Sequence, residues 1–247
     1  MTDASWYGVT PEPVATFVPP PSPPPSACDI SNSHPRYVAN DIIGWDNPKT
    51  TIVDLFAGAG GNAIAFALSS QWTRVIAIEK DASTLACAQH NAAIYDVDTQ
   101  ITWVHGDCFE FLARALSNAS ETGGETKGKT DAETEDVDLA PELHIDPAET
   151  VLFASPPWGG PGYTTDEVFD LSQMQPYNLA KLHAACKSVD YALYLPRTSD
   201  LRQLAKLVPD GQKVDVVQYC MRGASKAMVA YMPAQPVAEE KDQRPPE

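Results

Sequence analysis

A loop of prolines, glycines and one tryptophan follows an apolar run in the second half of the chain. The loop reads Ser-Pro-Pro-Trp-Gly-Gly-Pro from Ser155 to Pro161, and the preceding run, Thr150–Ala154, has the composition of a buried strand. Prolines and glycines end the strand and fix a rigid turn there. Such a loop can stack a flat ring on Trp158 while backbone carbonyls bind an amine on the ring's edge. This chemistry suits methylation of an exocyclic amine, and a tight turn with a packed tryptophan is the alternative.

A glycine-rich turn forms a second candidate site, between an apolar run and a predicted helix. The segment Asp54–Asn62 reads Asp-Leu-Phe-Ala-Gly-Ala-Gly-Gly-Asn. Glycines at such a turn allow the backbone to approach a ligand closely, and the amino terminus of the following helix favours a carboxylate or phosphate. The spacing does not match the dinucleotide pattern G-x-G-x-x-G, so an ordinary strand-to-helix turn stays open as an alternative.

Two further acids follow the next two predicted strands. Glu79 lies 25 positions after Asp54 and ends an apolar strand, where a carboxylate can accept both hydroxyls of a ribose. Asp107 follows the third strand, where it could accept a hydrogen bond from an adenine amine, cap the next helix, or do both. A solvated acid is the alternative for Glu79. The carboxyl ends of parallel strands share one edge of a sheet, so the sequence predicts that all these candidates lie on one rim.

The elements that must position these residues follow from the alternation of apolar runs and helical periodicity. We expect strands at Thr51–Phe56, Arg74–Glu79, Ile101–His105, Thr150–Ala154 and Tyr191–Leu195, helices at Asn62–Ser69, Ala82–Ile94, about Asn178–Ser188 and Asp200–Leu207, and β-rich runs at Lys213–Met221 and Lys226–Met232. This order predicts an α/β fold: a Rossmann-like, doubly wound, mostly parallel seven-stranded sheet closed by a C-terminal antiparallel hairpin.

Charge and cysteine content restrict the class of partner. The formal charge is −16, and half of it lies between Ser117 and Thr150, where ten acidic residues face two lysines. Extended binding to nucleic acid is therefore not expected, whereas local recognition of a short or capped end is compatible with this charge. Five scattered cysteines without a C-x-x-C pair indicate neither a disulfide framework nor a zinc site, so no metal is expected. No apolar run is long enough to cross a bilayer, and we expect a soluble protein that is not secreted.

Five segments together resemble class I S-adenosylmethionine-dependent methyltransferases, and within them the trimethylguanosine synthases that hypermethylate RNA caps. The segments are Trp6–Glu12, Asp54–Asn62, Val75–Glu79, Ser155–Tyr163 and Tyr194–Arg197. General methyltransferases share only the glycine-rich turn, the acid and a looser Pro-Pro-aromatic loop. The added Trp-Gly-Gly-Pro and the Val-Thr-Pro-Glu stretch favour the narrower family, and the resemblance covers most of the chain outside the insertions.

The resemblance implies S-adenosyl-L-methionine as the cofactor and assigns residues to it. Glu79 would hold the ribose, and Asp107 would hold the adenine. The methionine end would be bound by Asp54 together with the glycine-rich turn. The cofactor-binding residues implied by the resemblance are Asp54, Gly58, Gly60, Asn62, Glu79, Asp107 and Thr10.

The resemblance also implies a 7-methylguanosine-capped RNA as the substrate. Trp158 would stack on the cationic 7-methylguanine, and the backbone carbonyls of Ser155 and Pro156 would orient the guanine N2 amine. Arg197 would contact cap phosphates, for which a permanently charged fork is suited; a surface ion pair is the alternative. The product would be the 2,2,7-trimethylguanosine cap. An amino methyltransferase acting on adenine or a protein amide, and an inactive cap- or cofactor-binding remnant, stay as alternatives.

The chain is expected to divide into a motif segment with a Pro-rich spacer at 1–35, a methyltransferase domain at 36–233 and a disordered tail at 234–247. Within the domain, the stretch 117–149 is expected to be an acidic disordered insertion. Small nuclear or nucleolar RNAs are the substrates implied by the resemblance. Nuclear residence, in the nucleolus or Cajal-body-like compartments and with the cytoplasm as a second location, is inferred from the resemblance alone.

Overall fold

The computed structural model describes residues 49–117, 140–159, 167–221 and 224–235. Several sequence predictions fall outside these ranges. They concern the Trp6–Glu12 motif with Thr10, the Pro-rich spacer, most of the acidic insertion, Gly160–Tyr163 and the tail, and they stay predictions.

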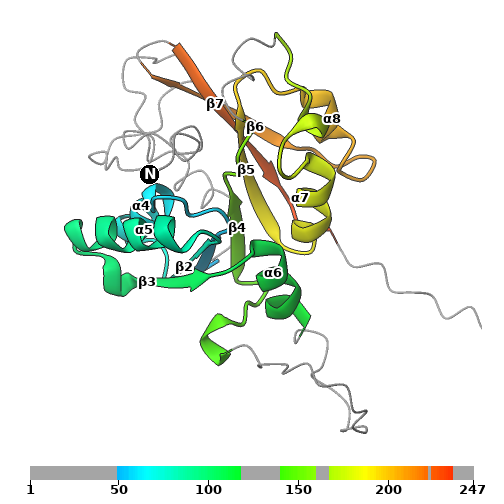
Figure 1. Cartoon of the computed structure of the whole chain (residues 1–247). Helices are drawn as coiled ribbons and strands as arrows, with labels where there is room; N and C mark the ends of the chain where they lie inside the picture. Colours follow the sequence, from blue (N-terminus) through cyan, green and yellow to red (C-terminus); the bar gives the residue numbers. More distant parts are fainter. Residues whose placement is uncertain (1–48, 118–139, 160–166, 222–223, 236–247) are drawn as a thin grey trace, which may run out of the picture.

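A seven-stranded sheet forms the centre of the molecule, with strand order β3-β2-β1-β4-β5-β7-β6 (Figure 1). The strands are β1 (Thr51–Asp54), β2 (Arg74–Glu79), β3 (Ile101–His105), β4 (Thr150–Ala154), β5 (Asp190–Pro196), β6 (Asp215–Met221) and β7 (Ala224–Met232). The first five pair in parallel, and β7 pairs antiparallel with both β5 and β6. The predicted fold is therefore confirmed, including the closing hairpin, whose second strand lies inside the sheet and whose first strand forms the edge.

Within the described residues, five α-helices flank the sheet, and Figure 1 shows that they cover both of its faces. They are α4 (Gly61–Leu68) and α5 (Ala82–Ile94) on one side, and α6 (Cys108–Ser117), α7 (Leu179–Cys186) and α8 (Leu201–Ala205) on the other. Short 3-10 helices lie at Asp98–Gln100, Pro141–Leu143 and Leu171–Gln173. No helix in the described ranges has both the length and the apolar character needed to span a membrane.

Side-chain caps explain where several helices begin. Asp81 accepts a hydrogen bond from the Thr84 N–H at the start of α5, and Asn178 accepts one from Lys181 N–H at the start of α7. These bonds satisfy donors that a first helical turn leaves without partners. At α4 the cap position is Gly60 instead, with a left-handed backbone and no side-chain cap. Its amino terminus is therefore shaped by the glycine-rich turn.

Strand β1 ends at Asp54, two positions before the expected Phe56. The chain turns at this point because the Leu55 N–H bonds to the Phe153 carbonyl and the Ala57 N–H bonds to the Ile78 carbonyl. Leu55 and Phe56 thus belong to the turn. This early end brings the glycine-rich segment across the carboxyl ends of β4 and β2.

A buried ion pair fixes the opposite, amino-terminal edge of the parallel strands. The Lys49 ammonium lies 2.9 Å from Oδ2 of Asp190, and the two side chains are 6% and 17% exposed. The same ammonium donates to the carbonyls of Pro147 and Thr150, at 3.0 and 2.9 Å. Asp190 also accepts from the Ala234 N–H. The cluster joins the starts of β1, β4 and β5 to the residues after β7.

Candidate active site

A cavity of about 450 Å³ lies at the carboxyl edge of the parallel strands. Its wall is formed by the turns after β1, β2, β3 and β4 and by Tyr177, which precedes α7. This volume is within the roughly 300–1,000 Å³ of small-molecule sites, and the position is where open α/β sheets bind ligands. Of the residues that the sequence predicts on this rim, Gly58, Asn62, Glu79, Asp107 and Ser155 line the cavity.

The glycine-rich turn needs glycine at two positions for different reasons. Gly58 has φ +53° and Gly60 has φ +89°, values in the left-handed region that other residues rarely adopt. A Cβ on Gly58 would meet no atom within 4 Å, whereas one on Gly60 would lie 3.2 Å from the Cβ of Ala88 in α5. Gly58 therefore serves the path of the backbone beside the cavity, and Gly60 also permits close packing of the turn on α5.

Glu79 is anchored by the backbone on both carboxylate oxygens. Oε2 accepts from Gly58 N–H at 2.9 Å, and Oε1 accepts from Asp81 N–H at 2.8 Å. The carboxylate is half-buried and lines the cavity. Each oxygen keeps a lone pair for a further donor, so Glu79 can accept from two adjacent hydroxyls, as a ribose requires.

Asp54 lies beneath the turn and does not line the cavity. It is fully buried, Oδ1 accepts from Phe56 N–H at 3.2 Å, and Oδ2 has no hydrogen-bond partner among the described residues. Burial raises the pKa of Asp54 to about 7; the bond from Phe56 acts in the opposite direction, and the neighbouring Glu79 raises the pKa further. The carboxyl groups of Asp54 and Glu79 interact electrostatically, and their negative charge when ionised favours a positively charged ligand.

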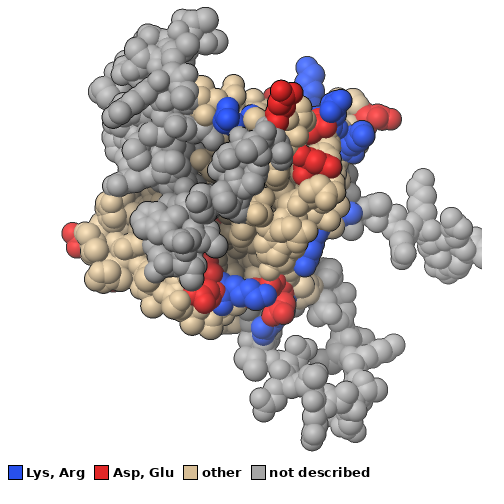
Figure 2. Space-filling view, turned by 45° about the horizontal axis from the view of Figure 1, so that its top comes forward, with Lys and Arg blue, Asp and Glu red and all other residues tan. Residues whose placement is uncertain are grey.

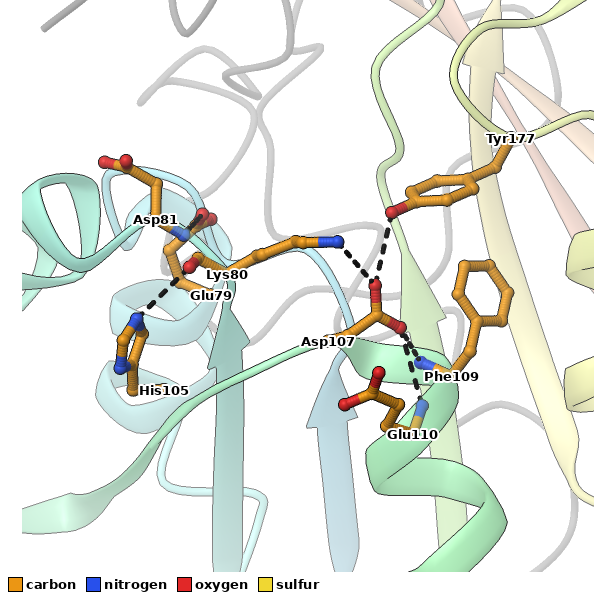
Figure 3. Close-up of polar contacts among 8 residues, drawn as sticks. All are labelled: Glu79, Lys80, Asp81, His105, Asp107, Phe109, Glu110 and Tyr177. Atoms are coloured by element: carbon orange, nitrogen blue, oxygen red, sulfur yellow. Dashed lines mark hydrogen bonds and ion pairs between the residues drawn. The ribbon is translucent and has the colours of Figure 1, made fainter.

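Asp107 caps α6 and also lines the cavity (Figure 3). Its Oδ1 accepts from Phe109 N–H at 2.9 Å, which confirms the predicted capping role. Its Oδ2 accepts from the Lys80 ammonium at 3.0 Å and from the Tyr177 hydroxyl at 3.3 Å. Partial burial acts to raise the pKa of Asp107, but the bonds from Lys80 and Phe109 outweigh it and lower the pKa below its ordinary value. Asp107 is therefore ionised at neutral pH.

The Ser-Pro-Pro-Trp loop reaches the cavity only in part. Ser155 is buried and lines the cavity together with the exposed Pro157, whereas Pro156 and Trp158 do not line it. Trp158 is 8% exposed, its Nε1 donates to the Tyr194 carbonyl at 3.2 Å, and its ring stacks on that of Tyr194 with centroids 5.7 Å apart and 18° between planes. The indole thus has a fixed orientation next to the end of β5.

Arg197 follows β5 and is exposed. It forms no hydrogen bond or ion pair with another residue that the structure describes, so the surface ion-pair alternative finds no partner in that part of the chain. On the face shown in Figure 2, basic and acidic side chains lie next to each other instead of forming a basic stripe. This pattern suits recognition of a short charged group more than of a long polyanion.

Sequence reasoning missed Lys80, Tyr177 and Phe56 in the cavity wall. Lys80 directly follows Glu79, so its place at the end of a ligand-binding strand was the available signal. Tyr177 contacts Asp107 across 70 positions of sequence, and no local pattern marks such a contact. Its ring packs on those of Phe109 and Phe56, with centroids 4.8 and 5.9 Å apart.

The properties of the cavity fit S-adenosylmethionine. Glu79 offers acceptors for a ribose, and Asp107 offers an anionic acceptor for an adenine amine. Beneath the cavity wall, Asp54 adds negative charge when it is ionised, which favours the cationic methionine ammonium and sulfonium. No group of three or more metal-binding side chains occurs within the described ranges.

Comparisons with known proteins identify relatives in sequence and in structure. The chain is 27% identical to a trimethylguanosine synthase of Schizosaccharomyces pombe over 92% of its own length and 75% of that protein. It is 29% identical to a trimethylguanosine synthase of Saccharomyces cerevisiae over 83% of its length, and it spans about half (51%) of that protein. Among solved structures, it is similar to an RNA methyltransferase of Salinibacter ruber crystallised with S-adenosyl-L-homocysteine, with 15% identity, a TM-score of 0.42, and 83% and 96% of the two chains covered.

The family model described as RNA cap guanine-N2 methyltransferase matches residues 49–235. These residues include the whole described sheet, the cavity and the Ser-Pro-Pro-Trp loop. The predicted family and its cofactor, S-adenosylmethionine, are thereby confirmed. Because the match extends over well more than half of the sequence, the chain belongs to the RNA cap guanine-N2 methyltransferase family.

Proposed function

We propose that the protein transfers methyl groups from S-adenosylmethionine to the exocyclic N2 amine of a 7-methylguanosine RNA cap and so forms the 2,2,7-trimethylguanosine cap. The single observation that carries this proposal is the family match over residues 49–235, which contain the cavity at the carboxyl edge of the sheet. Family membership gives the reaction, and the cavity supplies the acceptors that the cofactor needs.

On the cofactor side, we assign the ribose to Glu79, the adenine to Asp107 and the cationic methionine end to the turn around Gly58, with Asp54 beneath it. When bound, S-adenosylmethionine supplies a methyl group made electrophilic by its sulfonium. The reaction requires no nucleophilic side chain, because alignment of the amine with the methyl carbon provides most of the catalysis. Glu79 contributes to alignment because two backbone N–H groups fix its carboxylate.

On the cap side, we assign the guanine N2 amine to the backbone carbonyls of Ser155 and Pro156. A guanine amine is a weak nucleophile because its lone pair is delocalised into the ring. Carbonyls that accept its hydrogens would localise the lone pair and direct it towards the cavity, which Ser155 lines. We assign no general base.

Trp158 is proposed as the stacking platform for 7-methylguanine. Its indole donates a hydrogen bond to the Tyr194 carbonyl and stacks on the Tyr194 ring. A ring fixed in this way loses little conformational freedom when it binds, and its π face attracts a cationic base beyond ordinary stacking. Arg197, exposed at the end of β5, is proposed to contact the cap phosphates.

Small nuclear and small nucleolar RNAs are the proposed substrates, and the nucleus is the proposed location. Both follow from the resemblance of the sequence to trimethylguanosine synthases. Sequencing of RNAs that cross-link to the protein in cells, together with localisation of a tagged chain, tests both points. Enrichment of messenger RNA caps with exclusion from the nucleus would contradict them.

Incubation with methyl-labelled S-adenosylmethionine tests the reaction. The substrates are RNA with a 7-methylguanosine cap, RNA with an unmethylated guanosine cap, uncapped RNA, DNA and a protein extract. We expect label only in the 7-methylguanosine-capped RNA. Label in DNA adenine or protein would support the alternative amino methyltransferase, and binding of cofactor and cap without transfer would support an inactive remnant; either result contradicts the proposal.

A further inference from the structure

The carboxylate of Asp107 accepts four hydrogen bonds from the protein itself (Figure 3). Oδ1 accepts from the N–H groups of Phe109 and Glu110, at 2.9 and 3.4 Å. Oδ2 accepts from the Lys80 ammonium and the Tyr177 hydroxyl, at 3.0 and 3.3 Å. An ionised carboxylate has about four lone-pair positions, so these donors take its full capacity.

The two oxygens of Asp107 differ in how readily they can be freed. Donors to Oδ1 are backbone groups of the first turn of α6, and their loss would remove the helix cap. Donors to Oδ2 are side chains. A ligand amine that binds Asp107 must therefore compete for Oδ2 with Lys80, with Tyr177 or with both.

Lys80 is the donor that is easier to displace. Its side chain is 69% exposed, and its ammonium extends from the end of β2 to a carboxylate beyond β3 (Figure 3). Exposed ion pairs of this kind contribute little to stability, and a released ammonium is well hydrated. The same bond to Asp107 raises the pKa of Lys80 above its ordinary value, so Lys80 stays charged and competes throughout the neutral range.

Tyr177 is held in place by its surroundings. Its ring contacts Phe109 edge to face, at 4.8 Å between centroids, and Phe56 at 5.9 Å. The Lys181 ammonium lies 4.7 Å from the centre of the Tyr177 ring, a cation–π contact. The hydroxyl can stay beside Asp107 while the flexible Lys80 leaves.

We propose that Lys80 and Tyr177 control cofactor affinity with opposite signs: Lys80 occupies the Asp107 oxygen and is displaced by the 6-amino group of adenine, whereas Tyr177 stays and holds the carboxylate in position. This inference rests on the proposed function. It makes Tyr177 a positioning residue and Lys80 a built-in competitor of the ligand.

Calorimetric titration with S-adenosylhomocysteine tests the two signs without any catalytic turnover. Lys80→Met should bind about two- to fivefold more tightly than the natural protein, because no ion pair has to be broken. Tyr177→Phe should bind about three- to tenfold more weakly, because Asp107 loses a donor that orients it. Lys206→Met, which removes a similarly exposed lysine in α8's C-cap, is the matched control and should bind as the natural protein does.

A second ligand separates the proposed exchange from general charge effects. S-inosylhomocysteine carries a carbonyl where the adenine amine would be, so Lys80→Met should not bind it more tightly. Added salt provides another readout. Raising the ionic strength from about 0.1 M to about 1 M shortens the Debye length from about 10 Å to about 3 Å and so weakens the Lys80–Asp107 ion pair. The affinity of the natural protein for S-adenosylhomocysteine should therefore rise with salt, and this rise should be absent in Lys80→Met.

The outcomes distinguish this inference from the proposed function. If the natural protein does not bind S-adenosylhomocysteine, the proposed function is wrong and this inference fails with it. If it binds but Lys80→Met and Lys80→Gln bind equally well or more weakly, the exchange at Asp107 is wrong and the proposed function stands. An equal gain for the inosyl ligand would also overturn it. Thermal unfolding of each variant without ligand confirms that the fold is kept.

Discussion

The backbone N–H of Gly58 lies 2.9 Å from Oε2 of Glu79 and donates a hydrogen bond to it. This bond joins the turn after β1 to the end of β2 at the cavity wall. The residue that shapes the methionine end of the proposed site therefore also fixes the acid proposed to hold the ribose. Disturbing one should disturb the other.

Glu79→Gln should weaken binding of S-adenosylhomocysteine by about 10- to 100-fold, because it replaces a charged acceptor of two ligand hydroxyls with an amide. The change keeps the size of the side chain. Calorimetric titration measures the affinity, and Glu149→Gln, an exposed glutamate at the amino-terminal edge of β4, is the control. Equal affinities of Glu79→Gln and the natural protein would remove Glu79 from the cofactor site.

Asp54 should make the free energy of unfolding depend on pH. The pKa of Asp54 is about 7 in the folded protein and ordinarily 3.8, so the folded state binds the proton more tightly than the unfolded chain. The contribution of Asp54 to stability is therefore full below the ordinary value and is lost as the pH rises through about 7. Asp54→Asn removes this dependence while keeping an acceptor for Phe56 N–H.

Between pH 5 and pH 7, Asp54→Asn should gain on the order of 2–3 kcal/mol in unfolding free energy relative to the natural protein. Urea unfolding at a series of pH values measures the difference. The exposed Asp210→Asn serves as a control and should follow the natural protein throughout. A constant difference between Asp54→Asn and the natural protein across this range would mean that Asp54 is ionised in the fold.

Trp158 should contribute to cap binding and not to cofactor binding. Trp158→Ala should abolish methyl transfer, but it also removes a buried ring at a cost of about 3–5 kcal/mol in stability. Trp158→Phe is the sharper variant because it keeps a ring stacked on Tyr194 and loses the larger π face and the Nε1 donor. It should lower affinity for 7-methylguanosine triphosphate about tenfold and leave that for S-adenosylhomocysteine within about twofold.

The matched control for Trp158→Phe is Trp72→Phe. Trp72 has the same 8% exposure and packs on Phe66, away from the cavity wall. Both ligands should bind this control normally. A parallel loss of cap and cofactor affinity in Trp158→Phe would assign Trp158 to packing alone.

Arg197→Ala should weaken binding of 7-methylguanosine triphosphate about tenfold and leave binding of the 7-methylguanosine nucleoside unchanged, because only the former carries phosphates. Arg202→Ala is the control, since Arg202 is similarly exposed but paired with Asp200. Fluorescence titration of each ligand gives the comparison. Equal losses for nucleoside and triphosphate would place Arg197 on the base and not on the phosphates.

The sheet and the rim of the site could be predicted because both depend on local sequence. A short apolar run between predicted helices, such as Val75–Ile78, indicates a buried strand of a parallel sheet. An acid that follows such a run must lie at the end of that strand. The sequence indicated helix α6 only through the capping role suggested for Asp107. Its first turn is tied to that carboxylate, so the acid has structural and proposed functional roles at once.

The side chains that surround Asp107 could not be predicted, because long-range packing places them. Tyr177 reaches Asp107 only after α6 and α7 pack together, and Lys80 depends on the direction of a flexible side chain. The stacking of Trp158 on Tyr194 likewise joins residues 36 positions apart. Sequence patterns identify which strand end carries a group, but they do not identify its neighbours across the cavity.

The position of the transferred methyl group tests the central claim most directly. The measurement is mass spectrometry, against synthetic standards, of the nucleosides released from 7-methylguanosine-capped RNA after reaction with S-adenosylmethionine and the protein. We predict 2,2,7-trimethylguanosine, formed through 2,7-dimethylguanosine, and neither product with Glu79→Gln under limiting cofactor. An RNA that carries new methyl groups at any position other than the cap guanine N2, or a cap that stays 7-methylguanosine while cofactor and cap both bind, would contradict the account.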